Sequence, residues 1–119
     1  MLENHSEWLP YFKCSICSNG LLYFSEKVQE VFNKYSNFID FSISIDGNKE
    51  LHDACRVDVG GNPTYEKAIS AVKHFRENYG VLNNTKMTVS PDNVSYLTKA
   101  IINLINEDYK YIHCNCIFE

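Results

Sequence analysis

Polar side chains gather in four short segments, each at the end of a run in which apolar and polar residues alternate. The segments are 17–20 (Cys-Ser-Asn-Gly), 44–47 (Ser-Ile-Asp-Gly), 90–93 (Ser-Pro-Asp-Asn) and 116–119 (Cys-Ile-Phe-Glu). An aspartate in such a place accepts hydrogen bonds from ribose hydroxyls, and a nearby serine donates or accepts them. Because ligands of parallel α/β proteins bind at the carboxyl ends of strands, these segments are candidate ligand contacts. Taken singly, the Asn-Gly and Asp-Gly pairs are equally typical of ordinary turns.

The five cysteines are further candidates for chemistry, at positions 14, 17, 55, 114 and 116. Their odd number and the absence of a secretory signal in residues 1–10 argue against an extracellular disulfide framework. We expect reduced thiols in a reducing or anaerobic cytoplasm. Four thiolates would be available to a zinc ion if the first and last strands were neighbours: Cys14, Cys17, Cys114 and Cys116. Ordinary buried cysteines are the favoured alternative, so no metal site is assigned to this chain.

Two histidines lie in informative places. His52 follows segment 44–47 in a polar stretch, where we expect it to fix a loop by hydrogen bonding rather than to act as a base. His113 alternates with Ile112 and Cys114, so it faces the opposite side of the last predicted strand from them. No spacing supports a Ser/His/Asp triad or a pair of acid–base carboxylates. The sequence therefore assigns no catalytic residue.

Length and charge exclude several classes of protein. The chain has 119 residues, with 11 Lys and Arg against 15 Asp and Glu, which gives a net charge of −4. This acidic balance lacks the basic surface that nucleic-acid binding requires. The longest apolar runs are only a few residues, so no membrane span is expected and a cytoplasmic protein is the default. The length suits one domain, whereas a closed (β/α)₈ barrel needs about 250 residues.

The hydrophobic period alternates between two and 3.6 along most of the chain, which predicts strands and helices in turn. The predicted strands are 11–17, 38–46, 86–90 and 111–118. The predicted helices follow a cap at Ser25, run from Thr64 to Asn78, and follow a cap at Asp92 or Asn93. Residues 1–10 form a short N-terminal lead-in. The order β-α-β-α-β-α-β implies parallel strands joined by right-handed helical crossovers.

The second predicted strand helps to choose between a doubly wound sheet and an arc of a (β/α) barrel. One face carries Ile39, Phe41, Ile43 and Ile45, and the other carries Asp40, Ser42, Ser44 and Asp46. A central strand of a doubly wound sheet is covered on both faces and is nearly continuous in aliphatic residues. Small polar residues on one face fit a barrel lumen that accepts a polar ligand. An antiparallel sheet with a solvated face would alternate too, but the helical crossovers argue against it.

Residues 42–56 resemble the fourth-strand region of radical S-adenosylmethionine (radical SAM) enzymes. They read Ser-Ile-Ser-Ile-Asp-Gly-Asn-Lys-Glu-Leu-His-Asp-Ala-Cys-Arg. The pattern S-x-D-G followed by H-D-x-x-R is typical of the anaerobic sulfatase-maturase and peptide-maturase branch, the SPASM type. Residues 60–65 (Gly-Gly-Asn-Pro-Thr-Tyr) are similar to the glycine-rich loop and helix start that follow in that branch, and segment 18–20 is similar to the end of its third strand. The resemblance spans roughly residues 11–119.

The resemblance implies a fold and a cofactor. Residues 1–119 would form a partial radical SAM core, supplying strands three to six of a partial (β/α)₆ TIM-like barrel. Ser44 and Asp46 would lie beside the ribose of S-adenosylmethionine, and Phe118 would contact the adenine. Asn19 and Gly20 would border the same pocket on the substrate side.

Arg56 matches the arginine of the family signature. The resemblance leaves open whether it touches the cofactor or braces the loop. A salt bridge from Arg56 to Asp53 or Asp58 is an equally plausible structural role, because both carboxylates are close in sequence.

The sequence departs from the family where the iron–sulfur cluster is bound. Radical SAM chemistry needs a [4Fe-4S] cluster held by C-x₃-C-x₂-C, and this spacing occurs nowhere in the chain. No Gly-Gly-Glu-type motif for the methionine amino group is present either. We therefore expect the central portion of a peptide- or protein-modifying radical SAM enzyme, inactive by itself. The complete enzyme would cleave S-adenosylmethionine to a 5′-deoxyadenosyl radical and act on a peptide or protein substrate.

Two other hypotheses belong to different classes. A stand-alone α/β binding or interaction module without redox chemistry would be monomeric and would unfold cooperatively. A zinc-binding interaction domain is the other hypothesis. The predicted edge strands carry few charges, with Lys13 the only one on the first, so self-association through the sheet edges is expected of a partial barrel.

Overall fold

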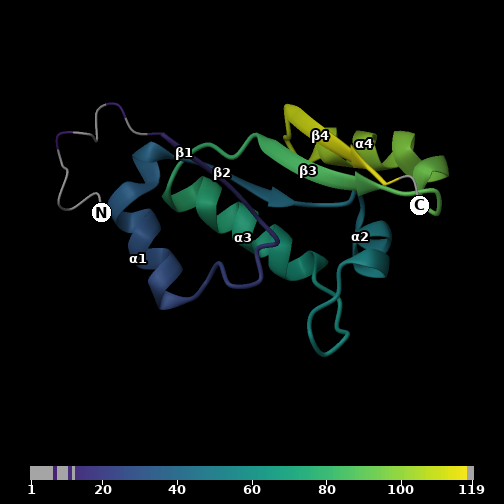
Figure 1. Ribbon diagram of the computed structural model, residues 1–119, viewed down its shortest axis with the longest axis horizontal. Helices are drawn as coiled ribbons and strands as arrows, with labels where there is room; N and C mark the ends of the chain where they lie inside the picture. Colours follow the sequence, from purple (N-terminus) through teal and green to yellow (C-terminus); the bar gives the residue numbers. More distant parts are fainter. Residues whose placement is uncertain (1–6, 8–10, 12, 118–119) are drawn as a thin grey trace.

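The computed structural model describes residue 7, residue 11 and residues 13–117. Its centre is a sheet of four parallel strands, coloured from purple to yellow along the chain in Figure 1. The strands are β1 (Cys14–Ser18), β2 (Ile39–Ser44), β3 (Asn84–Val89) and β4 (Tyr111–Cys116). The strand order is β1-β2-β3-β4, so each strand pairs with the next one in the sequence.

Four helices connect or extend these strands. They are α1 (Glu26–Tyr35), α2 (Lys49–Cys55), α3 (Tyr65–Asn78) and α4 (Leu97–Asn106). The start of α1 is as predicted, because the Ser25 side chain accepts a hydrogen bond from the backbone N–H of Val28. Among the described residues, no helix is both long enough and apolar enough to cross a bilayer.

The sequential strand order distinguishes between the two predicted architectures. In a doubly wound sheet the strand order reverses, whereas in a (β/α) barrel every crossover moves to the next strand in the same direction. The predicted α/β arc of parallel strands is therefore confirmed. Within the described residues the sheet is open, with β1 and β4 as its edges.

The two faces of the sheet differ in polarity, as the alternation in β2 predicts. Phe41 of β2 is buried against Phe32 of α1 and Phe75 of α3, with ring centroids 4.8 and 5.0 Å away. Ala100 and Leu104 of α4 complete the same buried core. The hydrophobic core thus lies between the helices and one face of the sheet.

α2 is the one helix that the sequence pattern did not predict. It has only seven residues, and two of the three that are at least half-buried are polar (Leu51, His52 and Asp53), so it shows no clear apolar period. The Asn48 side chain caps it by accepting from the backbone N–H of Leu51 at 3.0 Å. Gly47 precedes this cap with a φ of 98°, and a Cβ there would lie 2.5 Å from the Cβ of Ala100 in α4. Close packing of the strand end on α4 therefore requires glycine in this Asp-Gly pair.

The predicted cap of the last helix is wrong. α4 begins at Leu97, after a 3₁₀ turn over Val94–Tyr96, and neither Asp92 nor Asn93 caps it. The Asn93 side chain instead accepts from the backbone N–H of Ser90 at 2.8 Å, which closes a turn after β3. Asparagine forms such turns as readily as helix caps, so sequence alone did not separate the two.

The strand order also bears on the zinc hypothesis. Cys14 and Cys17 lie on β1, whereas Cys114 and Cys116 lie on β4 at the opposite edge of the sheet. Three strand spacings separate the two edges, roughly 14 Å along the sheet. The condition that the first and last strands be neighbours is not met, and the described residues contain no group of three or more metal-ligating side chains.

Candidate functional site

The carboxyl end of β2 leads into a buried carboxylate whose two oxygens each have a partner. Asp46 is 2% exposed, and its Oδ2 accepts from Nε of Arg56 at 2.7 Å within an ion pair. Its Oδ1 accepts from the backbone N–H of Thr88 at 2.9 Å. Asp46 therefore joins the end of β2 to β3 and to the segment after α2. The predicted alternative for Arg56 is wrong, because its ion-pair partner is Asp46 and neither Asp53 nor Asp58.

His52, on α2, connects the backbone of Asp46 to the start of α3. The backbone N–H of Asp46 donates to Nδ1 of His52 at 3.2 Å, and Nε2 lies 3.1 Å from Oγ1 of Thr64. The Thr64 hydroxyl in turn donates to the carbonyl oxygen of Arg56. Because a backbone N–H only donates, Nδ1 is the acceptor and the proton of the neutral ring is on Nε2. Burial lowers the pKa of His52, which favours this neutral form.

Asp53, the next residue, supplies the N-terminal cap of α3. Its Oδ1 accepts from the backbone N–H groups of Thr64 and Tyr65 at 3.0 and 2.8 Å, and its Oδ2 pairs with Lys49 at 3.0 Å. Partial burial acts to raise the pKa of Asp53, but these hydrogen bonds outweigh it and lower the pKa. The His-Asp pair thus fixes two elements: His52 the end of β2, and Asp53 the start of α3.

A cavity of about 310 Å³ opens beside the Asp46–Arg56 pair. Its walls come from the ends of β2 and β3, the end of α2, the turn after β3 and the residue that follows β4. The lining residues are Asp46, Cys55, Arg56, Thr88, Ser90, Asn93 and Ile117. A carboxylate, a guanidinium, hydroxyls and an amide converge here beside an aliphatic wall, a composition typical of sites for small polar molecules. We call it the carboxyl-end cavity.

Three other predicted contacts, Ser44, Asn19 and Gly20, do not line this cavity. Ser44 is half-buried, with its Oγ 3.3 Å from Sγ of Cys17 on the neighbouring strand. Asn19 is exposed at the end of β1, and Gly20 is buried with a φ of 81°. The structure therefore brings Asp46 and Arg56 into direct contact. Ser44, Asn19 and Gly20 lie at the carboxyl ends of β2 and β1. Phe118 lies outside the described residues.

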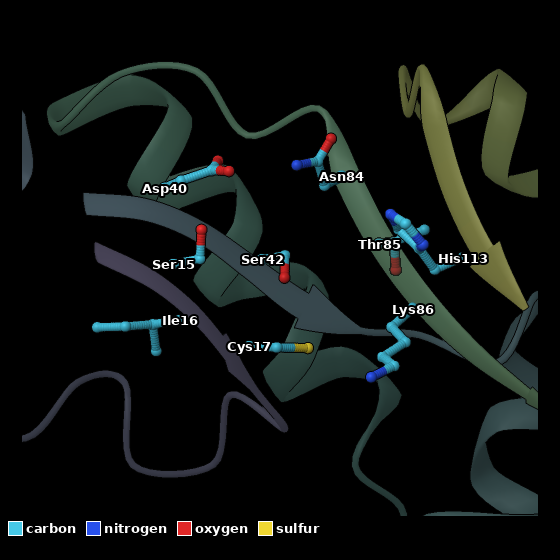
Figure 2. Close-up of a pocket in the computed structure, with 9 residues that line it drawn as sticks. All are labelled: Ser15, Ile16, Cys17, Asp40, Ser42, Asn84, Thr85, Lys86 and His113. Atoms are coloured by element: carbon cyan, nitrogen blue, oxygen red, sulfur yellow. The ribbon is translucent and has the colours of Figure 1, made fainter. Parts of the chain in front are cut away.

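A second set of polar side chains lies on the face of the sheet opposite the core. We call this face of the sheet the open face. It contains a recess of about 300 Å³ lined by residues of all four strands. Figure 2 shows the residues that line it. Its lining residues are Ser15, Ile16, Cys17, Asp40, Ser42, Asn84, Thr85, Lys86 and His113. Lys86 and His113 are register partners on β3 and β4. His113 thus shares a face with the polar residues of β2, as the strand alternation predicts.

Five cavity residues were missing from the predicted contacts: Cys55, Thr88, Ser90, Asn93 and Ile117. Ser90 and Asn93 belong to segment 90–93, which the strand-end argument singled out but did not assign to the cofactor. Thr88 gave no separate signal, since it is one polar residue in an alternating strand. Only the parallel pairing of β2 with β3 reveals that Thr88 lies beside Asp46.

The chain does not fit an iron–sulfur cluster. Its five cysteines lack the C-x₃-C-x₂-C spacing, and all five are free thiols that lie on two strands and at the end of α2. A [4Fe-4S] cluster is held by cysteine thiolates that converge on one place, and the described residues contain no group of three or more metal-ligating side chains. No chemical step through a cluster is therefore derived for these residues.

Comparison with known proteins gives structural neighbours only. No family model matches the chain, and no curated protein is significantly similar to it. The structure of native anSMEcpe with bound AdoMet and the Kp18Cys peptide has a TM-score of 0.77 at 22% identity, covering 100% of this chain and 34% of that one. The complex with the Cp18Cys peptide gives 0.75 at 23%, covering 98% and 34%. Hexahistidine-tagged anSMEcpe with bound AdoMet gives 0.74 at 24%, covering 88% and 28%.

The protein anSMEcpe is a SPASM-type radical SAM anaerobic sulfatase maturase. The present chain spans about a third of its length. Its four-stranded parallel sheet has the fold of the corresponding part of the radical SAM TIM-like barrel. The resemblance that the motifs in 18–20 and 42–65 carry is thus confirmed at the level of the fold.

Proposed function

We propose that residues 1–119 are a central part of a radical SAM peptide- or protein-modifying core, corresponding to strands three to six, and that they bind S-adenosylmethionine at the carboxyl-end cavity. One observation carries the proposal: Asp46, Arg56 and Thr88 form a polar cluster at the carboxyl ends of two parallel strands. Ligands of such folds bind at these ends, and the solved neighbours of this fold carry AdoMet.

The residues of the cavity suit the chemical groups of this cofactor. A carboxylate has about four acceptor positions, and Asp46 uses two of them, which leaves capacity for ribose hydroxyls. The side chain of Arg56 is 27% exposed and has further N–H groups for the anionic end of the ligand. Ser44 would add a hydroxyl on the same strand. Asn19 and Gly20 would border the substrate side, and Phe118 would contact the adenine.

In this class of enzyme, the chemistry that S-adenosylmethionine supplies beside a [4Fe-4S] cluster is abstraction of a hydrogen atom from the substrate. Since this chain lacks the cluster motif, we propose that it binds the cofactor without cleaving it. The residues around the cavity orient the ligand, and the remaining chemistry requires cluster ligands from outside these residues.

The proposed partner is a peptide or protein substrate. Two of the solved neighbours are complexes with peptides. In this chain the open face around Lys86 and His113 adjoins Ser44 and offers hydrogen-bonding side chains that helices do not cover. The five free thiols suit a reducing compartment such as the cytoplasm.

Calorimetric titration with S-adenosylmethionine tests the proposal. We expect one binding site in the wild-type chain and loss of measurable binding in Asp46→Ala. The matched control is Asp40→Ala, which removes a carboxylate from the open face of the same strand and should leave the affinity unchanged. Equal binding by all three proteins, or no binding by any, would reject the carboxyl-end cavity as the site.

Anaerobic iron–sulfur reconstitution of the wild type should give no [4Fe-4S] absorption, and a stable cluster signal would contradict the proposed lack of cleavage.

A second candidate is the stand-alone binding module, which predicts a monomer with one sharp unfolding transition. Two observations favour association instead. Within the described residues β1 and β4 have no outer neighbour, and an apolar recess of about 320 Å³ beside β1 is lined in part by Ile16, Leu22 and Val31. Unprotected strand edges tend to pair with other chains.

Light scattering after size exclusion, over a range of protein concentrations, distinguishes the two candidates. The partial-core proposal predicts dimers or larger species that Ile16→Lys reduces, because the charge would lie beside the β1 edge. A concentration-independent monomer would favour the binding module.

A further inference from the structure

We infer that His52 and Thr64 are positioning residues of the S-adenosylmethionine site, acting on Arg56 and Asp46 through a closed ring of hydrogen bonds. The inference rests on the proposed function, because it assigns roles to residues that do not themselves line the carboxyl-end cavity.

The ring begins and ends at Asp46. Its backbone N–H donates to His52, His52 donates to Thr64, and Thr64 donates to the backbone carbonyl of Arg56. The guanidinium of Arg56 then donates back to the Asp46 carboxylate. Four residues from the end of β2, from α2, from the following segment and from the start of α3 are thereby closed into one unit.

The direction of every bond in the ring is fixed. The first donor is a backbone N–H, and the oxygen of Arg56 that accepts from Thr64 is a carbonyl, so neither end can reverse. Only the neutral His52 with its proton on Nε2 satisfies both neighbours. His52 and Thr64 are 1% and 3% exposed, so water cannot easily replace either partner.

The ring holds both the backbone and the side chain of Arg56. Thr64 fixes the backbone carbonyl, and Asp46 fixes the guanidinium, while the side chain still reaches the cavity. An arginine free to rotate would lose several rotamers on binding a ligand, whereas one already held loses fewer. Pre-organisation of Arg56 is therefore the contribution expected from His52 and Thr64.

A matched pair of threonines separates positioning from stability. The Thr64 hydroxyl donates to the carbonyl of Arg56, and the Thr85 hydroxyl donates to the carbonyl of Ile43 at 2.8 Å. Both threonines are buried, but Thr85 lies in the sheet and does not line the carboxyl-end cavity. Thr85→Val removes one buried hydroxyl bond. Thr64→Val removes two, the bond that Thr64 donates to Arg56 and the one that it accepts from His52, and only this variant opens the ring.

The experiment measures the Kd for S-adenosylmethionine and the melting temperature of wild type, Thr64→Val, Thr64→Ser and Thr85→Val. We expect Thr64→Val to weaken binding about tenfold, Thr64→Ser to restore it to within about threefold, and Thr85→Val to melt earlier with unchanged Kd. Equal affinity in the two valine variants would overturn the positioning role. Failure of the wild type to bind would instead reject the proposed function.

A second readout needs no ligand. The NMR signal of the Arg56 Nε–H, held by Asp46, should exchange slowly with water in the wild type and in Thr85→Val. It should exchange faster in Thr64→Val and in His52→Asn, which keeps an acceptor near Nδ1 but loses the donor at Nε2. Unchanged exchange in these two variants would show that the ring does not hold Arg56, whatever the chain binds.

Discussion

Asp46 and Asp40 belong to the same run of alternating residues and lie on the same side of it, yet their surroundings are opposite. Asp46 is buried and bonded to Arg56 and to β3, whereas Asp40 is exposed at the other end of β2. A buried polar group must be paired because water is excluded, while an exposed one is satisfied by solvent. One end of the strand is therefore rigid, and the other is free to adapt.

The same contrast extends to the histidines. His52 is buried, and its two ring nitrogens bond to different elements, whereas His113 is exposed on β4. We call the bonded group of Asp46, His52, Arg56 and Thr64 the corner. We interpret the corner as the part that fixes a cofactor and the open face as the part that accepts a peptide or protein substrate. Each of the following variants tests one side of this comparison.

The largest expected effect comes from Asp46→Ala. Removing this carboxylate leaves the Arg56 guanidinium and the backbone N–H of Thr88 without their partner, so we expect the free energy of unfolding to fall by about 3 kcal/mol. The matched variant Asp40→Ala should change it by less than about 0.5 kcal/mol. Urea denaturation measures both values. Similar losses in the two variants would remove the distinction between the corner and the open face.

Asp53→Ala should have the next largest effect. It removes the cap of α3, and caps of this kind contribute about 1 kcal/mol. The exposed Asp92, which caps no helix, serves as the control in Asp92→Ala. Thermal melting compares the two variants. A loss in Asp53→Ala no greater than in the control would show that the carboxylate does not cap α3.

The free energy of unfolding should depend on pH because of His52. Because the pKa of His52 is lowered in the folded chain, the unfolded chain takes up a proton first as pH falls below about 6.5. The free energy of unfolding is therefore complete above this pH and declines below it, until the His52 imidazole of the folded chain is also protonated. The charged or titratable groups that face the ring are Asp46, Arg56, Asp53 and Tyr65.

Urea midpoints between pH 5 and 7.5 measure this decline, and His52→Gln should reduce it. The control His113→Gln replaces an exposed histidine on the open face and should leave the slope as in the wild type. Identical slopes in the two variants would contradict the role of a buried neutral His52. The lowered pKa of Asp53 acts at lower pH, below about 4, and so does not interfere.

The smallest effect is expected for Lys86→Ala. Its side chain is exposed on the open face, so the free energy of unfolding should change by less than about 0.5 kcal/mol. A loss above 1 kcal/mol would show that the open face is as tightly bonded as the corner.

The sequence predicted the strands and helices whose apolar residues recur at the spacing of a strand or of a helix. Strand alternation in 38–46 placed Asp40, Ser42 and Ser44 opposite the core, and the helix–strand order predicted parallel pairing. α2 escaped prediction because seven largely polar residues give no period, and it forms through its Asn48 cap and the packing of Gly47 on α4.

The site was predicted only in part, for a related reason. Asp46 and Arg56 were recognisable from a motif, but their contact depends on how α2 turns the chain back toward β2. Thr88 joins them through strand register, which local sequence does not contain. The partner of Arg56 was misjudged because closeness in sequence favoured Asp53 and Asp58 over a residue ten positions away.

Mapping the NMR chemical shifts of backbone amides during titration with S-adenosylmethionine is the most direct test of the central claim. The account predicts that the largest changes fall on Asp46, Arg56, Thr88 and Ser90 around the carboxyl-end cavity, with Ser15, Asp40 and Asn84 on the open face little affected. Largest changes on the open face, or none at saturating ligand, would contradict it.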